Sequence, residues 1–131
     1  MREVRVYSKS KEGAQKVSEH FRVREFACSD GSDPIFIDPA LVTVLQAIRS
    51  HFGRAVTVHS AYRTPAKNAA VGGAKQSRHL YGMAADISVK GIAPAAVAQY
   101  AETLLAGRGG IGVYPTFTHV DVRDARARWQ G

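Results

Sequence analysis

The sequence predicts an α+β fold, because helices alternate with strands along the chain but the last two strands form a hairpin. The 131 residues are enough for one domain with a hydrophobic core and too few for two, so residues 1–131 are expected to form a single domain. Hydrophobic residues make up 45% of the chain and charged residues 22%, which is typical of a globular protein. No apolar run approaches the roughly 20 residues that a membrane-spanning helix needs.

The amino-terminal part of the chain predicts little regular structure. A short strand is expected at residues 3–7, and a helix is expected to begin near Ser10. Residues 20–37 are expected to be irregular and anchored by aromatic side chains, namely Phe21, Phe26 and Phe36.

A long helix is predicted to follow and to end at Gly53. Asp38 can cap its amino end, and Pro39 suits its first turn. Its apolar residues recur at helical spacing, namely Leu41, Val44, Leu45, Ile48 and Phe52.

The second half of the chain alternates between strands and helices. β-Branched residues predict a strand at 55–59, and Pro and Gly residues predict a loop over about 62–73. The remaining predicted elements are a strand at 86–89, a helix at 94–105, and two strands at 109–114 and 117–122 around a short turn at Pro115.

Three residues from separated segments form a candidate metal site, namely His79, Asp86 and His119. Two imidazoles and one carboxylate suit zinc with an open fourth position, and such a site makes water nucleophilic at neutral pH. Because side chains alternate along a strand, His119 and Asp121 share one face, as do Asp86 and Ser88. The aliphatic side chains of both strands point to the opposite face, toward the core. This pattern predicts a metal cleft on one face of a sheet.

These segments resemble the peptidase M15 family of zinc D-Ala-D-Ala carboxypeptidases and murein endopeptidases, which is similar in fold to the Hedgehog signalling domain. The resemblance covers about residues 35–129, and Trp129 fits the phage-type single-domain members. It implies a small antiparallel sheet flanked by helices, with the zinc cleft on one sheet face. The motifs that carry it are SAYRTP at 60–65, SRHLYGMAAD at 77–86, and GGIGVYP at 109–115 running into HVD at 119–121.

The resemblance implies roles for five residues. His79, Asp86 and His119 would bind Zn²⁺. Arg63 would lie near the substrate, where its guanidinium suits a carboxylate or a developing oxyanion, although a surface ion pair is the alternative. Ser77 would hydrogen-bond the substrate or cap a turn.

The general base departs from the better-known family pattern. Many members carry a Glu three residues before the last zinc histidine or a His two residues before it, and here these positions are Thr116 and Phe117. Asp121 is the nearest carboxylate, and it could accept a proton from the attacking water or orient His119. Asp121 could also replace His119 as the ligand, although zinc's preference for imidazole favours His119.

The formal net charge of +7 favours an anionic partner, and no recognisable nucleic-acid-binding motif accompanies it. The expected partners are peptidoglycan stem peptides, without nucleic acid or membrane insertion, and the chain is expected to be a monomer. Its charged start lacks the apolar stretch of a signal peptide. We therefore expect synthesis in the cytoplasm and action on the cell wall after lysis or phage delivery.

The sequence thus predicts a zinc-dependent hydrolase of peptide bonds in peptidoglycan, either a D-Ala-D-Ala carboxypeptidase or a murein endopeptidase. One alternative is a zinc-bearing binding module without catalysis, because the usual base is missing. Another is a basic nucleic-acid binder, whose binding would weaken steeply with salt and survive zinc removal.

Overall fold

The centre of the fold is a five-stranded sheet, seen in a computed structural model that describes residues 3–131. In spatial order its strands are β5 (Val56–Ser60), β6 (Ala84–Val89), β8 (Thr118–Asp121), β7 (Gly110–Val113) and β9 (Ala127–Gln130). Neighbouring strands are antiparallel except β7 and β9, which are parallel. The predicted α+β fold is confirmed, and the sheet is antiparallel as predicted except at its edge, where β9 pairs with β7 in parallel.

Two helices cover one face of this sheet. The predicted helices are confirmed as α2 (Pro39–Phe52) and α4 (Pro94–Leu105), which contact each other as well as the sheet. The side chain of Asp38 accepts a hydrogen bond from the Ala40 N–H, and Gly53 closes α2 in the left-handed conformation. Their buried side chains join those of the strands in one core that includes Leu45, Ile48, Ile87, Val97, Ala101 and Val120.

The amino-terminal part of the chain forms two small sheets. β1 (Arg5–Ser8) pairs with β4 (Pro34–Ile37), and β2 (Lys16–Ser18) pairs with β3 (Phe21–Arg22), while α1 (Lys9–Glu12) and the 3₁₀ turn η1 (Val23–Phe26) connect them. The prediction that residues 20–37 are irregular is wrong in part, because the segment contains β3, which pairs with the neighbouring β2, and β4, which pairs with the distant β1. Phe21 and Phe26 are buried, as expected of aromatic anchors.

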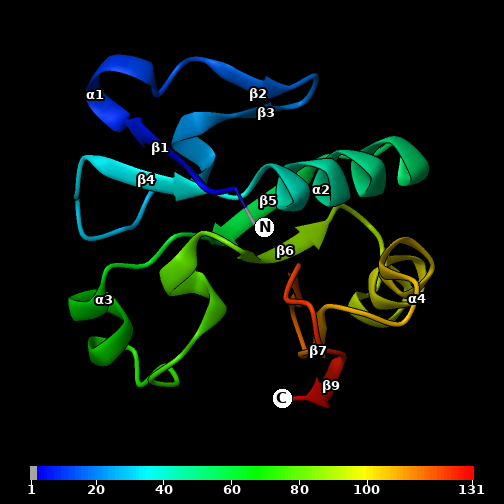
Figure 1. Cartoon of the computed structure of the whole chain (residues 1–131). Coiled ribbons are helices and arrows are strands. Elements are labelled where there is room, and N and C mark those ends of the chain that lie inside the picture. The colour runs from blue at the N-terminus through cyan, green and yellow to red at the C-terminus, as the bar shows by residue number, and fades with distance from the viewer. Residues whose placement is uncertain (1–2) are drawn as a thin grey trace.

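The segment between β5 and β6 carries two short helices. α3 (Pro65–Ala70) interrupts the predicted loop, because Thr64 caps its first turn and Pro65 follows at the first helical position. The 3₁₀ turn η2 (Arg78–Tyr81) ends at Gly82, whose φ of 70° is accessible to glycine. In Figure 1 this green segment lies to the left of β7 and β9, below β5 and β6.

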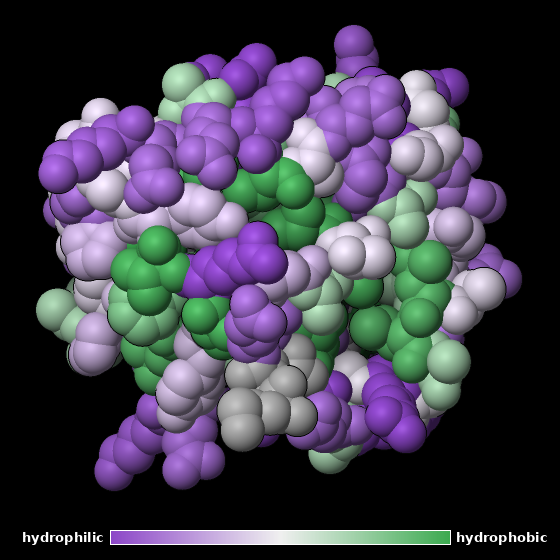
Figure 2. All heavy atoms as spheres, turned by 45° about the horizontal axis from the view of Figure 1, so that its top comes forward, coloured by the Kyte–Doolittle hydropathy of each residue, from purple (hydrophilic) through white to green (hydrophobic). Residues whose placement is uncertain are grey.

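The surface carries many polar side chains. In Figure 2 hydrophilic side chains crowd the upper part of the visible face, with hydrophobic patches between them. Among residues 3–131, no helix combines the length and apolar character needed to cross a bilayer.

Candidate metal centre

The three side chains that the sequence predicts as metal ligands meet in the structure. His79 lies in η2, Asp86 in β6 and His119 in β8. β6 and β8 are neighbours, and their register places Asp86 directly opposite His119. One donor atom from each of the three side chains lies within 4.8 Å of the others, and all three residues are buried. The geometry therefore offers a preformed three-ligand site.

Each histidine holds one ring nitrogen against a protein partner and turns the other toward Asp86. The Nδ1 of His79 donates to the main-chain oxygen of Ala61 (2.7 Å), and its Nε2 lies 3.3 Å from Asp86 Oδ2. The Nε2 of His119 bonds Asp121 Oδ2 (2.7 Å), and its Nδ1 lies 3.0 Å from Asp86 Oδ1. Fixing one imidazole nitrogen in this way orients the other toward a metal ion. The donor set of two imidazoles and one carboxylate fits zinc.

The buried cluster is electrostatically coupled. Burial raises the pKa of Asp86, but hydrogen bonds with His119 and His79 outweigh this, so that its pKa stays well below the ordinary value. Burial lowers the pKa of His119, but its bonds with Asp121 and Asp86 raise it above the ordinary value. Because a metal ion binds neutral imidazole, metal and proton compete for His119.

Asp121 lies behind His119 rather than in the cleft. Its carboxylate is fully buried and accepts hydrogen bonds from the backbone N–H groups of Gly110 (2.9 Å) and Arg123 (3.1 Å). The Arg123 side chain adds two more, from Nε to Oδ1 (2.8 Å) and from Nη2 to Oδ2 (2.7 Å). Burial raises the pKa of Asp121, but the bonds with His119 and Arg123 hold it well below its usual range. This placement favours an orienting role over that of proton acceptor or ligand.

Two glycines of β7 make room for this arrangement. Ile111 faces the core, whereas Gly110 and Gly112 lie opposite Asp121 and His119 in the register. A Cβ at Gly110 would collide with the Asp121 carboxylate, and one at Gly112 would collide with the Trp129 ring. The glycine spacing of β7 therefore reflects close approach of the site's side chains.

Trp129 of β9 forms part of the site's wall. Its ring centroid lies 4.9 Å from that of His119, and its Nε1 donates to the Tyr114 hydroxyl (2.9 Å). The Arg123 guanidinium lies 5.5 Å from the Trp129 ring centroid. β9, which the sequence pattern does not predict, thus supports His119 from the side.

The three ligands open into a cleft of about 460 Å³. Its lining also contains the predicted substrate residues Arg63 and Ser77. The Nη2 of Arg63 lies 3.5 Å from Asp86 Oδ2, and its Nη1 donates to Asn68 Oδ1 (3.4 Å). The Ser77 hydroxyl accepts a bond from the His79 N–H (3.3 Å), so it caps η2, which was the alternative role for this residue.

Sequence reasoning missed Asn68 and Arg123. Asn68 is 5% exposed, and its Nδ2 donates to the Ala74 main-chain oxygen (2.8 Å), which braces the loop beside the cleft. The Thr64-Pro65 pair could have indicated α3, but no pattern shows where the Asn68 side chain points. Arg123 follows His119-Val120-Asp121 closely, and only its guanidinium geometry reveals its contact with Asp121.

Comparisons with known proteins agree with this geometry. A family model described as Peptidase M15 matches residues 14–121. The chain is 40% identical over 94 residues to a zinc D-Ala-D-Ala carboxypeptidase of Streptomyces albus G. That alignment covers 66% of this chain and 36% of the relative, so the chain spans little more than a third of the curated protein it matches.

Proposed function

Because the chain belongs to the peptidase M15 family, we propose that it is a zinc-dependent hydrolase of peptide bonds in the stem peptides of bacterial peptidoglycan. The observation that carries the proposal is the convergence of His79, Asp86 and His119 in one cleft. The similarity to a zinc D-Ala-D-Ala carboxypeptidase supports this substrate class.

His79, Asp86 and His119 would hold the zinc ion. Bound there, zinc supplies Lewis-acid polarisation of the scissile carbonyl and lowers the pKa of water. The protein's own contribution is to fix the ligands before the ion arrives, through Ala61 for His79 and through Asp121 for His119.

Arg63 would position the peptide. Its Nε donates to the Ser60 hydroxyl (3.2 Å) and its Nη1 to Asn68, so the guanidinium is held at the cleft wall beside Asp86. A guanidinium in this place suits a substrate carboxylate or the negative charge that develops on the attacked carbonyl oxygen.

Asp121 would act as a positioning residue. It has no exposed surface from which to reach a substrate, and its oxygens are engaged by His119, Arg123 and Gly110. Asp121, which the sequence analysis considers as a general base, is therefore better placed to orient His119 than to accept a proton from the attacking water.

Digestion of purified murein by the zinc-loaded chain tests the proposal. We expect release of soluble stem-peptide fragments that a chelator abolishes, that added zinc restores, and that His119→Ala lacks. Mass spectrometry of the fragments would separate loss of a terminal D-Ala, the carboxypeptidase outcome, from internal cleavage, the endopeptidase outcome.

Two results would overturn it. Zinc-dependent binding to murein without any fragment release would make the chain a binding module. Nucleic-acid binding that weakens with salt and survives chelation, without murein hydrolysis, would favour the basic nucleic-acid binder.

A further inference from the structure

The cleft carries more positive than negative side chains. Among the described residues 3–131, three arginines line it, namely Arg63, Arg78 and Arg123, whereas Asp86 is the only carboxylate in its lining. Arg63 pairs with Asp86, and Arg123 pairs with Asp121 behind the wall. Of the three guanidiniums, that of Arg78 has no carboxylate partner among residues 3–131.

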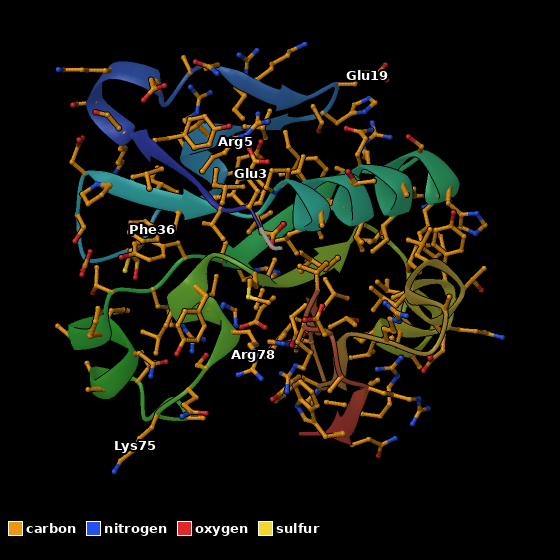
Figure 3. The ribbon with its side chains drawn as sticks, in the orientation of Figure 1. Glu3, Arg5, Glu19, Phe36, Lys75 and Arg78 are labelled. Carbon is orange, nitrogen blue, oxygen red and sulfur yellow. The ribbon has the colours of Figure 1, made fainter. Side chains whose placement is uncertain are left out.

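Arg78 is directed toward the cleft. It is half-buried and immediately precedes His79 in η2. Figure 3 shows its side chain at the edge of the space between η2 and the β7–β9 strands, whereas the labelled Lys75 of the same loop extends away into solvent. The one hydrogen bond that its guanidinium makes within residues 3–131 runs from Nη1 to the Gln76 main-chain oxygen (2.8 Å). The rest of its donor fork is available to a ligand.

The backbone that carries Arg78 is fixed before any ligand binds. Its main-chain oxygen accepts a bond from the Met83 N–H (3.2 Å), and the Gly73 N–H donates to the Asn68 main-chain oxygen (2.8 Å). With Asn68 also bonded to Ala74, both ends of the 73–78 loop are held. A side chain on such a fixed segment loses less conformational entropy on binding than one on a free loop.

We propose that Arg78 binds a free carboxylate of the peptide substrate and thereby selects peptides that carry a carboxylate at the bound position. The inference rests on the proposed peptidase function and names a specificity residue for it. Peptide amides are neutral and do not balance the positive charge of a guanidinium. A carboxylate balances this charge and can accept two parallel hydrogen bonds from the guanidinium. The carboxylate has two possible sources in a peptide, the chain terminus and an acidic residue.

Matched peptides separate these two sources. One pair differs only in a terminal carboxylate or carboxamide, and the other only in an acidic residue or its amide. Each peptide is assayed with the zinc-loaded wild type, Arg78→Gln, Arg78→Lys and the control Lys75→Gln, which removes the same charge from the exposed loop. We expect Arg78→Gln to raise KM about tenfold, with kcat little changed, for the carboxylate member of one pair only. Arg78→Lys should recover part of the loss, and Lys75→Gln should match the wild type.

Binding gives a readout that does not depend on turnover. The anisotropy of dye-labelled peptides, measured on the full chain with a chelator present, should show the same preference and its loss in Arg78→Gln. Equal carboxylate preference in wild type and Arg78→Gln, in both pairs, would overturn the inference even if every peptide is hydrolysed. Absence of hydrolysis with an Arg78-dependent binding preference would instead overturn the peptidase proposal and leave the carboxylate site standing. Thermal unfolding of each variant confirms that it is folded.

Discussion

The two faces of β6 and β8 bury side chains of opposite kinds. On one face Ile87 and Val120 pack against the helices, and on the other Asp86 and His119 form the metal site. The apolar face is stabilised by burial, which has no directional requirement. The polar face depends on pairing, and among residues 3–131 no buried side-chain nitrogen or oxygen lacks a hydrogen-bond partner.

This difference predicts different responses to substitution. Loss of volume on the apolar face should lower stability and leave the chemistry in place. Loss of a polar atom on the opposite face should impair metal binding at a smaller cost in stability, because the helices and core remain packed. The following variants test that division, from the largest expected effect to the smallest.

His119→Ala should reduce peptide hydrolysis to the background rate. The substitution removes one of three ligand atoms and leaves Asp86 and His79 with too few donors to hold zinc tightly. Bound zinc, measured by elemental analysis after dialysis, should fall well below one ion per chain, while circular dichroism stays close to that of the wild type. An unfolded variant would show that the polar face is needed for the fold itself.

Ile87→Ala should lower the free energy of unfolding by about 2–5 kcal/mol, because it opens a cavity in the core. Ile87 is fully buried and neighbours Asp86 along β6 but faces away from it. Urea unfolding measures the loss, and zinc stoichiometry under native conditions should remain one per chain. Loss of zinc from the folded variant would mean that the two faces are coupled.

The elements that the sequence predicts well are those with strong local signals. α2 has Asp38 and Gly53 at its ends and apolar residues at helical spacing, so its bounds follow from the chain alone. The short strands do not, because β4 and β9 exist through pairing with β1 and β7. β9 also depends on Arg128, whose guanidinium bonds Glu102 of α4 (2.6 Å from Nε to Oε2), a contact that no local pattern contains.

The same distinction holds for the site. Residue chemistry and strand alternation were enough to place Asp86 and His119 on one face, and their register confirms it. The surroundings of these ligands could not be predicted, because the contacts of Asn68 with Arg63 and of Arg123 with Asp121 depend on where the side chains point. The position of Asp121 behind His119 depends equally on Gly110, whose missing side chain provides the space.

Asp121→Asn should weaken zinc binding about 10- to 100-fold, because an amide holds the His119 Nε2–H less strongly than a carboxylate does. Turnover at saturating zinc should largely recover. Zinc affinity is measured by competition with a chromophoric chelator, and Arg123→Gln should show a weaker effect in the same direction. Unchanged zinc affinity with lost turnover would restore Asp121 as the proton acceptor.

The polar face should also respond to pH in the metal-free chain. The pKa of His119 is raised above 6.5, so its contribution to stability is present below about pH 6.5 and is lost as pH rises through the raised value. The pKa values of Asp86 and Asp121 are lowered from 3.8, so their contributions are present above about pH 4 and are lost as pH falls. Thermal unfolding should therefore show highest metal-free stability between these limits, whereas zinc should stabilise more as pH rises above 6.5.

Ser77→Ala should have the smallest effect, and it distinguishes the two roles predicted for this residue, capping of η2 and hydrogen bonding to the substrate. If Ser77 serves only as the cap of η2, the loss is about 1 kcal/mol of stability, with KM unchanged. If its hydroxyl also bonds the substrate, KM rises while zinc affinity stays constant, because the His79 ring is still fixed by Ala61. Ser77→Thr keeps the hydroxyl and serves as the control. A fall in zinc affinity would instead show that the cap sets the orientation of His79. In that case η2 would belong with the polar face of β6 and β8, whose function depends on exact pairing of its side chains.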